Sequence, residues 1–459
     1  MKTSGTTDTA APEAVDYRWT PQPAAARVVA ELLGRFCEHC DPARELAARL
    51  KSETGTRLLD WCDYLVVAPS DELGERLQVS GFLSTPDDGR TLWHHPGGLF
   101  PKIYTGAAAR DCLAIRVDSL EEFLHANQLG DLLPIEGEPG GPMAKARLYE
   151  CDDAELWIVE RHGFAGFEPQ PAAHAQFAAV DRHRRAFGHR RRDFPDPHYG
   201  FEHARHLFDA AAAELGRDWA CDLFFAEERA FWQRRNRAAQ AQKERQDVLG
   251  VGWANHDHHT YRSSRAHFAS LIGELEHMGF YCRERFYAGL GAGWGAQVLE
   301  QPACRVVIFA DVDLSPDDVR ADFAHSGLPD SAGRGTVGLW CELHGEAFLD
   351  AGMHHLECQF DFDEARHQLA AVGFPTMKPF TNFPHLKQAF TEGERWPVRE
   401  ERIASLVERG LLSPADAAEF RERGAIGSHL EILERNDGYQ GFNQTGIDEI
   451  IAATDPRRA

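Results

Sequence analysis

Hydrophobic residues in the first third of the chain follow first a helical and then a strand-like spacing. Residues 24–51 carry apolar side chains at helical spacing, which predicts helix. Short apolar runs typical of buried strands follow at 64–68, 112–117 and 156–159. We therefore expect an N-terminal α+β module over 23–165, preceded by a disordered tail over 1–22.

The next stretch, 166–250, has a different character. It is rich in Ala, Glu, Arg and Gln between 201 and 246, and it carries a basic run at 189–192. We interpret this stretch as a helical connector with solvated charged faces rather than as a binding patch.

The remainder, 251–459, begins with the order strand, helix, three strands. The pattern predicts a strand over 253–262, a helix over 265–278 and strands over 280–286, 296–300 and 305–310. A second round opens with a strand over 353–360 and a helix over 363–372, followed by helices over 384–390 and 399–420 and a strand over 429–433. This order is typical of paired βαβββ units that curl into half-barrels. The predicted fold class is α+β, with tandem βαβββ modules and helical insertions.

Composition and charge narrow the possible partners. The 459 residues include 49 Lys and Arg against 72 Asp and Glu, a net charge of −23. An acidic surface repels phosphate backbones and anionic lipids, which argues against nucleic acid and membranes as partners. The chain has no signal-peptide pattern and no apolar run of membrane length. We expect a cytoplasmic protein that binds small molecules.

Three of the predicted strands carry side chains that bind metals. His258 lies in the first strand, His355 in the second and Glu431 in the third. Polar side chains on a buried strand cost free energy unless they are paired or bound, and a metal-lined barrel interior would account for them. Two imidazoles and one carboxylate bind Fe(II) and leave coordination positions open, although the same residue types suit Mn(II) and Zn(II). Because the chain has 23 histidines, hydrogen-bonded core histidines are the alternative interpretation.

Neighbouring histidines are candidates for other roles. His256 shares a predicted strand face with the first ligand and is the alternative to it. His259 and His354 are expected to point away from the site. His429 shares a predicted face with the carboxylate ligand, so it is a candidate for orienting that carboxylate or for a surface position.

These segments resemble 4-hydroxyphenylpyruvate dioxygenase and its relatives in the vicinal-oxygen-chelate superfamily over residues 250–453. The first ligand of that family sits in an Asp-His pair, like Asp257-His258, and the second follows Gly-x-x-His, like Gly352 to His355. The third is a Glu on a late strand before Gly-Phe, like Glu431 before Gly441-Phe442. The resemblance implies that His258, His355 and Glu431 hold Fe(II). It also implies that the N-terminal module serves the fold and a homodimer.

The chain departs from the family near its end. The closing Gly-Phe-Gly-x-Gly-Asn-Phe motif is replaced by Gly-Phe-Asn-Gln-Thr-Gly-Ile over 441–447, which bears on the aromatic substrate rather than on the metal. The spacing His258-x-x-x-Arg262 is similar to 2-oxoadipate dioxygenase/decarboxylase enzymes, in which the Arg serves the substrate carboxylate. A salt bridge on the surface or between modules is the alternative for Arg262. Gln297 and Gln301 are candidates for hydrogen bonding a substrate or for an exposed strand face.

These features predict a non-haem Fe(II) dioxygenase, an oxidoreductase that takes O2 and a 2-oxo acid. By resemblance, oxidative decarboxylation would be coupled to hydroxylation of the same molecule. The alternatives are an extradiol-type ring-cleaving dioxygenase or another metal-dependent vicinal-oxygen-chelate enzyme. A non-catalytic protein that binds a small molecule is the third possibility.

Overall fold

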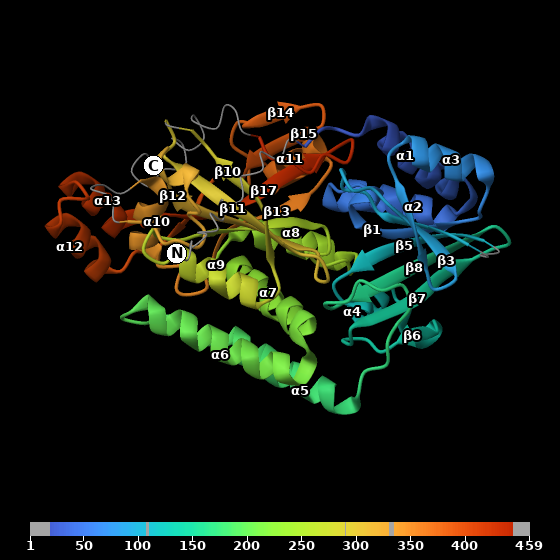
Figure 1. Ribbon diagram of the computed structural model, residues 1–459, viewed down its shortest axis with the longest axis horizontal. Helices are drawn as coiled ribbons and strands as arrows, with labels where there is room; N and C mark the ends of the chain where they lie inside the picture. Colours follow the sequence, from blue (N-terminus) through green and yellow to red (C-terminus); the bar gives the residue numbers. More distant parts are fainter. Residues whose placement is uncertain (1–18, 107–109, 290, 330–334, 444–459) are drawn as a thin grey trace, which may run out of the picture.

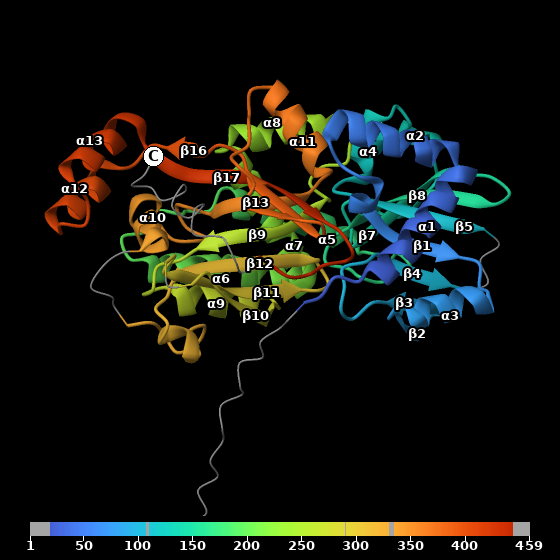
Figure 2. The same ribbon diagram turned by 90° about the horizontal axis from the view of Figure 1, so that it is seen from above.

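A computed structural model describes residues 19–106, 110–289, 291–329 and 335–443. Most of the predicted disordered tail, residues 1–18, therefore lies outside the described residues. Figures 1 and 2 show two halves side by side along the long axis of the molecule.

The first half opens with helices and continues as two strand–helix–strands units. The helices are α1 (Pro23–His39) and α2 (Asp41–Arg49), with short helical turns at Leu50–Thr54 and Leu58–Trp61. The first unit is β1 (Cys62–Val67), α3 (Asp71–Val79), β2 (Leu83–Asp87), β3 (Arg90–His94) and β4 (Lys102–Thr105). The second is β5 (Asp111–Val117), α4 (Leu120–Ala126), a turn at Gly130–Leu132, β6 (Ile135–Gly137), β7 (Met143–Glu150) and β8 (Ala154–Arg161). The predicted α+β character of this region is confirmed.

The second half repeats the same plan. Its first unit is β9 (His256–Arg262), α9 (Phe268–His277), β10 (Tyr281–Tyr287), β11 (Trp294–Gln301) and β12 (Val306–Asp313), followed by a turn at Asp318–Arg320 and α10 (Thr336–His344). Its second unit is β13 (Met353–Gln359), α11 (Phe362–Ala371), β14 (Thr381–Phe383), β15 (Leu386–Phe390), β16 (Glu394–Trp396), α12 (Glu400–Glu408), α13 (Pro414–Arg423) and β17 (Ala425–Arg435).

Within the described residues, the two sheets share one strand order. The first is β2-β3-β4-β1-β5-β8-β7-β6 and the second is β10-β11-β12-β9-β13-β17-β15-β14, with β16 paired to β17. In the second half, the last strand of each unit returns parallel to its first strand, as β12 does beside β9 and β17 beside β13. The two units meet where β9 and β13 pair antiparallel. A pocket lies over the centre of one face of each sheet, and we call this face concave.

Two predicted elements near the end of the chain are wrong. The segment 384–390 is not a helix, because β15 pairs antiparallel with β14 and β17. The predicted helix over 399–420 is two helices, α12 and α13. The break follows from Gly410, whose φ is +69°, and from Ser413, whose side chain accepts the backbone N–H of Asp416 and so caps a new helix. Both helices lie at the end of the molecule away from the first half (Figures 1 and 2).

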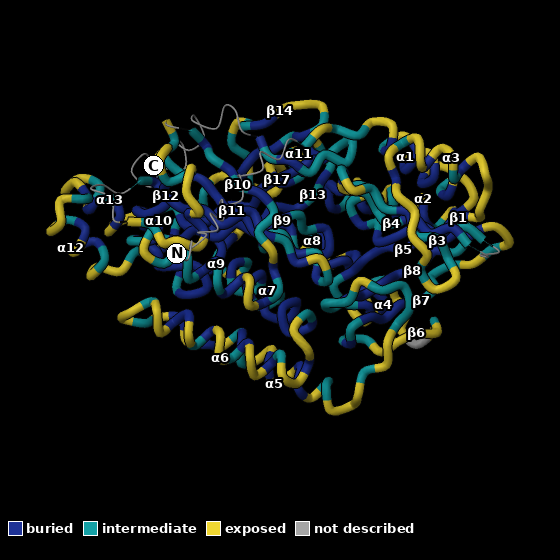
Figure 3. The backbone as a smooth tube through the Cα atoms, in the orientation of Figure 1, coloured by how far each residue is buried: buried dark blue, intermediate teal, exposed yellow. Residues whose placement is uncertain are grey.

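The stretch 166–250 forms α5 (His174–Gly188), α6 (Pro197–Leu215), α7 (Arg217–Gln233) and α8 (Arg237–Val248). The interpretation as solvated helices is wrong for α7, whose Phe224, Phe225 and Trp232 are fully buried in one core with the convex face of the second sheet. Figure 3 shows these buried helical turns beside exposed faces of α5 and α6. Half of the basic run is also internal: Arg190 and Arg192 both bind the buried carboxylate of Glu228, whereas its other two residues are exposed. The described helices include none long and apolar enough to cross a membrane.

Candidate metal centre

The centre of the second sheet brings the predicted ligands together. Glu357 on β13 lies opposite His258 on β9 and opposite Glu431 on β17. His355, two residues before Glu357 on the same strand, lies opposite Thr260. Because alternate side chains share a face, these side chains project from the concave side of the sheet.

The functional atoms lie within a few ångströms of one another. The Nε2 atoms of His258 and His355 lie 2.9 and 2.6 Å from one oxygen of Glu357. His355 Nε2 lies 3.7 Å from Oε2 of Glu431. Ligand atoms of His258, Glu357 and Glu431 lie within 4.8 Å of one another. All four side chains are at most 9% exposed. The three residues named from the sequence therefore meet, with Glu357 as an addition.

Glu357 is the residue that sequence reasoning missed as a ligand. The alternation of the strand puts it on the same face as His355, two residues earlier, and this was the available signal. Its Oε1 also accepts a hydrogen bond from the Thr260 hydroxyl at 2.9 Å. An ion held by both imidazoles would lie within reach of this carboxylate, because its oxygen is close to both nitrogens.

Two irregularities in the β9–β13 pairing decide the roles of the neighbouring histidines. The register shifts between Glu357 and Cys358, so that Asp257 is an extra residue on β9. His256 consequently does not share the face of His258; its ring centre lies 5.1 Å from that of His259, on the helical side. The register also shifts at His354, and this side chain lines the concave cavity instead of pointing away as predicted.

Each ligand candidate is held by a further residue. Asp257 accepts a hydrogen bond from His258 Nδ1 at 2.8 Å, which leaves Nε2 free for a metal. Asp257 also binds Arg435, and despite burial this cation holds the pKa of Asp257 far below its usual range. The Nδ1 atoms of His355 and His354 are hydrogen-bonded to each other.

The carboxylate of Glu431 is oriented by Gln388 rather than by His429. Gln388 Nε2 donates to Oε1 of Glu431 at 2.8 Å. His429 is fully buried, and its Nδ1 donates instead to the backbone oxygen of Thr391 at 3.0 Å. Gln388 escaped notice in the sequence because it lies in β15, the segment predicted as helix.

The donor set fits a divalent cation. Burial raises the pKa of Glu431 to about 7. Burial and then the charge of Glu431 raise the pKa of Glu357 well above its ordinary value. Oε2 of Glu357 has no hydrogen-bond partner among the described residues. Buried carboxylates without a balancing cation are costly, and two imidazoles with two carboxylates suit Fe(II), Mn(II) or Zn(II).

A cavity of about 80 Å³ opens over these residues. Its walls are mostly aromatic: Phe286, Trp294, Phe309, Phe380, Phe390 and Phe442. Arg262 and Asp311 form a polar end. Pockets for drug-sized ligands measure about 300–1,000 Å³, so this cavity has room for a small molecule only. Its apolar walls with a few convergent polar groups are typical of a ligand site.

Arg262 faces this cavity. The guanidinium is 3.6 Å from Asp311 on the neighbouring strand β12, so the pair lies within one unit and is not a bridge between modules. Nε and Nη1 of Arg262 have no hydrogen-bond partner among the described residues. Burial, which outweighs the nearby Arg262 charge, raises the pKa of Asp311 to about 7.

The two glutamines that were candidates for binding a substrate lie outside the cavity. Gln297 is buried, and its amide donates to the backbone oxygens of Glu284 and Val298. Gln301 binds Asp218 and backbone N–H groups. Neither residue is among those that line the cavity.

The first half has a matching concave face, and among its described residues no group of possible metal ligands was found there. Its central pairs, Tyr64–Ala114 and Val66–Cys112, correspond in strand order to His258–Glu357 and Thr260–His355. Trp157, opposite Ala114, corresponds to Glu431. Aromatic, thiol and methyl groups therefore replace the imidazoles and carboxylates.

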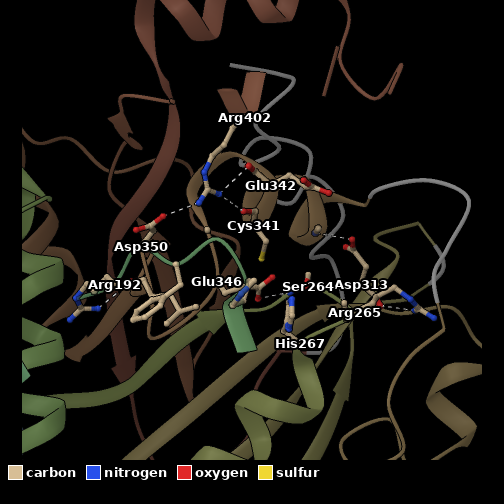
Figure 4. Close-up of a pocket in the computed structure, with 16 residues that line it drawn as sticks. Arg192, Ser264, Arg265, His267, Asp313, Cys341, Glu342, Glu346, Asp350 and Arg402 are labelled. Atoms are coloured by element: carbon tan, nitrogen blue, oxygen red, sulfur yellow. Dashed lines mark hydrogen bonds and ion pairs between the residues drawn. The ribbon is translucent and has the colours of Figure 1, made fainter. Parts of the chain in front are cut away.

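A second cavity, of about 280 Å³, lies beyond the ends of β9 and β12 (Figure 4). Its polar side chains are paired with their surroundings: Glu346 accepts from Ser263 and Ser264, and Arg402 donates to Asp350. Burial raises the pKa of the Cys341 thiol well above its ordinary value, so this thiol is a poor nucleophile.

Comparison with known proteins gives only distant similarity. No family model matches the chain, and no curated protein matches it. A Shewanella frigidimarina protein described provisionally as a hydrolase shares 15% identity and a TM-score of 0.34, over 49% of this chain and 98% of its own. A variant of 4-hydroxymandelate synthase from Streptomyces coelicolor shares 13% identity and a TM-score of 0.29, over 87% of this chain and 99% of its own. Methylmalonyl-CoA epimerase from Mycobacterium tuberculosis shares 14% identity and a TM-score of 0.23, over 40% and 88%.

The strand order decides the fold. Each half consists of two βαβββ units that meet at their first strands and curve around one concave face. The chain has the vicinal-oxygen-chelate fold. The predicted fold class is thereby confirmed. The ligand candidates occupy the concave face of the second half.

Proposed function

We propose that this protein is a non-haem Fe(II) dioxygenase that acts on a 2-oxo acid. The convergence of His258, His355 and Glu431 on one buried concave face supports this proposal most directly. These residues would hold the ion. When bound, Fe(II) supplies the redox chemistry that combines O2 with a 2-oxo acid.

The residues around the candidate ligands orient them and shape the cavity. Asp257 keeps the proton of His258 on Nδ1, and Gln388 fixes one oxygen of Glu431. Arg262 lines the cavity and has two nitrogens without hydrogen-bond partners among the described residues, and a guanidinium binds a carboxylate through two parallel hydrogen bonds. The aromatic walls exclude water from the bound acid.

Metal content tests the ligand assignment. Anaerobically purified protein is expected to bind about one Fe(II) per chain, and His258→Ala and Glu431→Ala to retain only a small fraction of it, because each loses a ligand atom. His259→Ala, on the opposite face of β9, is the matched control. Full iron content in both ligand variants, measured by mass spectrometry, would contradict the assignment.

Oxygen consumption tests the reaction. A panel of 2-oxo acids is expected to include one that stimulates O2 uptake with release of one CO2 per O2. O2 uptake without CO2 release would favour ring cleavage. Binding of the acid without turnover would favour a non-catalytic binding protein.

Glu357 lies close to both candidate imidazole ligands. This position supports a second candidate function, that of a redox-neutral metal-dependent enzyme of the same fold. If Glu357 were a fourth ligand beside His258, His355 and Glu431, a chelating 2-oxo acid would leave no room for O2. The bound ion would then supply Lewis-acid chemistry, the polarisation of a carbonyl, in place of redox chemistry.

Nitric oxide, a stand-in for O2, distinguishes the two candidates. For the dioxygenase, Fe(II) protein saturated with a 2-oxo acid is expected to bind nitric oxide, with an electron paramagnetic resonance signal. For the redox-neutral enzyme, wild-type protein gives no signal and Glu357→Gln acquires one. A signal of equal size in both proteins would show that Glu357 does not occupy the O2 position.

A further inference from the structure

A second group of metal-binding side chains lies outside the metal centre, at the edge of the second sheet where α9 and β10 lie side by side (Figure 2). Glu276 is in the last turn of α9, Cys282 is on β10, and His325 is in the segment that follows the turn at Asp318–Arg320. One ligand atom from each of these residues lies within 4.8 Å of the other two. The proposed reaction uses none of these three side chains.

Three separate parts of the chain meet in this group. The turn between α9 and β10 places Sγ of Cys282 3.7 Å from Oε1 of Glu276. Among the described residues, β10 is the edge strand of its sheet and pairs only with β11. The segment that carries His325 contacts this edge strand, because Arg285 of β10 donates to the backbone oxygen of Ala321 at 3.1 Å.

The spacing of the ligand atoms is close to that around a zinc ion. Zinc binds a thiolate sulfur at about 2.3 Å and nitrogen or oxygen at about 2.0–2.2 Å in a tetrahedral arrangement, so two ligand atoms on one ion lie about 3.3–3.7 Å apart. Nε2 of His325 lies 3.0 Å from Oε1 of Glu276, and Sγ of Cys282 lies 3.7 Å from the same oxygen. Small rotations of the side chains therefore suffice to bring all three atoms to one ion.

Asp322 orients the imidazole of His325. Its Oδ2 lies 2.8 Å from Nδ1 of the ring, and Nε2 is on the side of Glu276. Imidazole ligands of metals are commonly held in this way, by a carboxylate on the other ring nitrogen. The side chains of His325 and Glu276 are 44% and 39% exposed, so an ion has access from solvent, and water can complete its coordination.

The charges around the three residues favour an added cation. Burial and then the charge of Glu276 raise the pKa of Cys282 to about 12. Although burial opposes the charged form, the carboxylates of Glu276 and Asp322 raise the pKa of His325. Both groups therefore hold protons at neutral pH, and a divalent ion that displaces these protons supplies the positive charge in their place.

We propose that Glu276, Cys282 and His325 bind one Zn(II) ion at a site separate from the metal centre. A thiolate combined with an imidazole favours zinc over magnesium or calcium, which prefer oxygen ligands. The ion joins the segment around His325 to the edge strand β10 and to the end of α9, so its role is structural. This site does not depend on the proposed function.

Cobalt spectroscopy tests the zinc site. Co(II) can replace Zn(II), and a thiolate ligand gives Co(II) a charge-transfer band in the near ultraviolet. The candidate ligands of the metal centre include no cysteine, so this band does not arise there. We expect the full-length, reduced protein to develop the band on titration with Co(II), and Zn(II) to abolish it because Zn(II) binds such sites more tightly.

Variants assign the band to its ligands. Cys282→Ser is expected to remove it, and Asp322→Asn to weaken the Co(II) affinity of this site about 10-fold or more, because the imidazole loses the carboxylate that orients it. Cys37→Ser changes another partly exposed cysteine, in the first half, and is the matched control that should keep the band.

The outcomes separate this site from the proposed function. Wild-type protein without the band, or a band of full size in Cys282→Ser, would overturn the zinc site and leave the metal centre unaffected. In His258→Ala, which removes a candidate ligand of the metal centre, the band should be unchanged. Loss of the band in that variant, with the circular dichroism of the wild type, would also contradict a separate zinc site.

Discussion

At the scale of single residues, the buried charge of Arg262 indicates what the cavity of the second half binds, which the positions of the candidate metal ligands alone do not. Arg262 is 6% exposed and has one carboxylate neighbour, Asp311. The buried guanidinium therefore has unused hydrogen-bonding capacity inside the cavity. A substrate carboxylate would use that capacity.

Replacing Arg262 should weaken binding of the acid and leave metal binding unchanged. We expect Arg262→Met to weaken binding of a dicarboxylic 2-oxo acid by about 10–100-fold, the effect of losing a charged hydrogen bond. Calorimetric titration of the metal-loaded protein measures this change. Fe(II) content should stay near that of the wild type, and a loss of metal without a change in acid affinity would contradict the role.

The sequence was sufficient to select the candidate ligands but not to predict their exact surroundings. Metal-binding residue types on three strands, together with the family resemblance, were sufficient to select His258, His355 and Glu431. The extra residues in the β9–β13 pairing were not predictable, because a bulge leaves no periodic signal. They turn His256 away from the cavity and His354 toward it.

At the scale of elements, α7 links the connector to the second sheet through one buried carboxylate. Glu228 is 0% exposed and binds Arg190, Arg192 and the Tyr261 hydroxyl. Although burial opposes its charge, the two arginines lower the pKa of Glu228 to about 2. Two arginines of the basic run that suggested a solvated surface thus lie in the core.

Removing this charge should destabilise the second half. We expect Glu228→Gln to lower the free energy of unfolding by about 3–5 kcal/mol, because it leaves two buried guanidinium groups without a counterion. Urea denaturation followed by circular dichroism measures the change. Glu400→Gln, which breaks an exposed pair with Arg421, should change little, and equal effects in both variants would contradict this account.

Most elements followed from hydrophobic periodicity, and the exceptions have local causes. β9 to β13, α9 and α11 lie within a few residues of their predicted bounds. β15 is too short for its period to separate strand from helix. Its identity depends on pairing with β17, which is distant in sequence.

At the scale of the whole molecule, charged groups join the first half to the connector. His162, next to the end of β8, bonds Glu160 at 2.7 Å and Asp222 on α7 at 2.8 Å. Although burial opposes the charged form, these carboxylates raise the pKa of His162 to about 10. The imidazolium therefore connects the first half to α7.

This connection should depend on pH. A folded pKa of about 10 exceeds the unfolded value of about 6.5, so the stabilisation is complete below pH 6.5 and is lost as the pH rises toward 10. We expect His162→Gln to lower the melting temperature most at pH 6 and least at pH 10. A difference independent of pH in differential scanning calorimetry would contradict the ion-pair role.

The ligand-free concave face of the first half has a consequence for the whole protein. There, Tyr64, Cys112, Ala114 and Trp157 occupy the central positions, and the sheet still forms through backbone pairing and its apolar core. The architecture therefore does not need an ion to hold its strands together. Treatment with a chelator should abolish reactivity while leaving the far-ultraviolet circular dichroism unchanged, and returning the ion should restore activity without refolding.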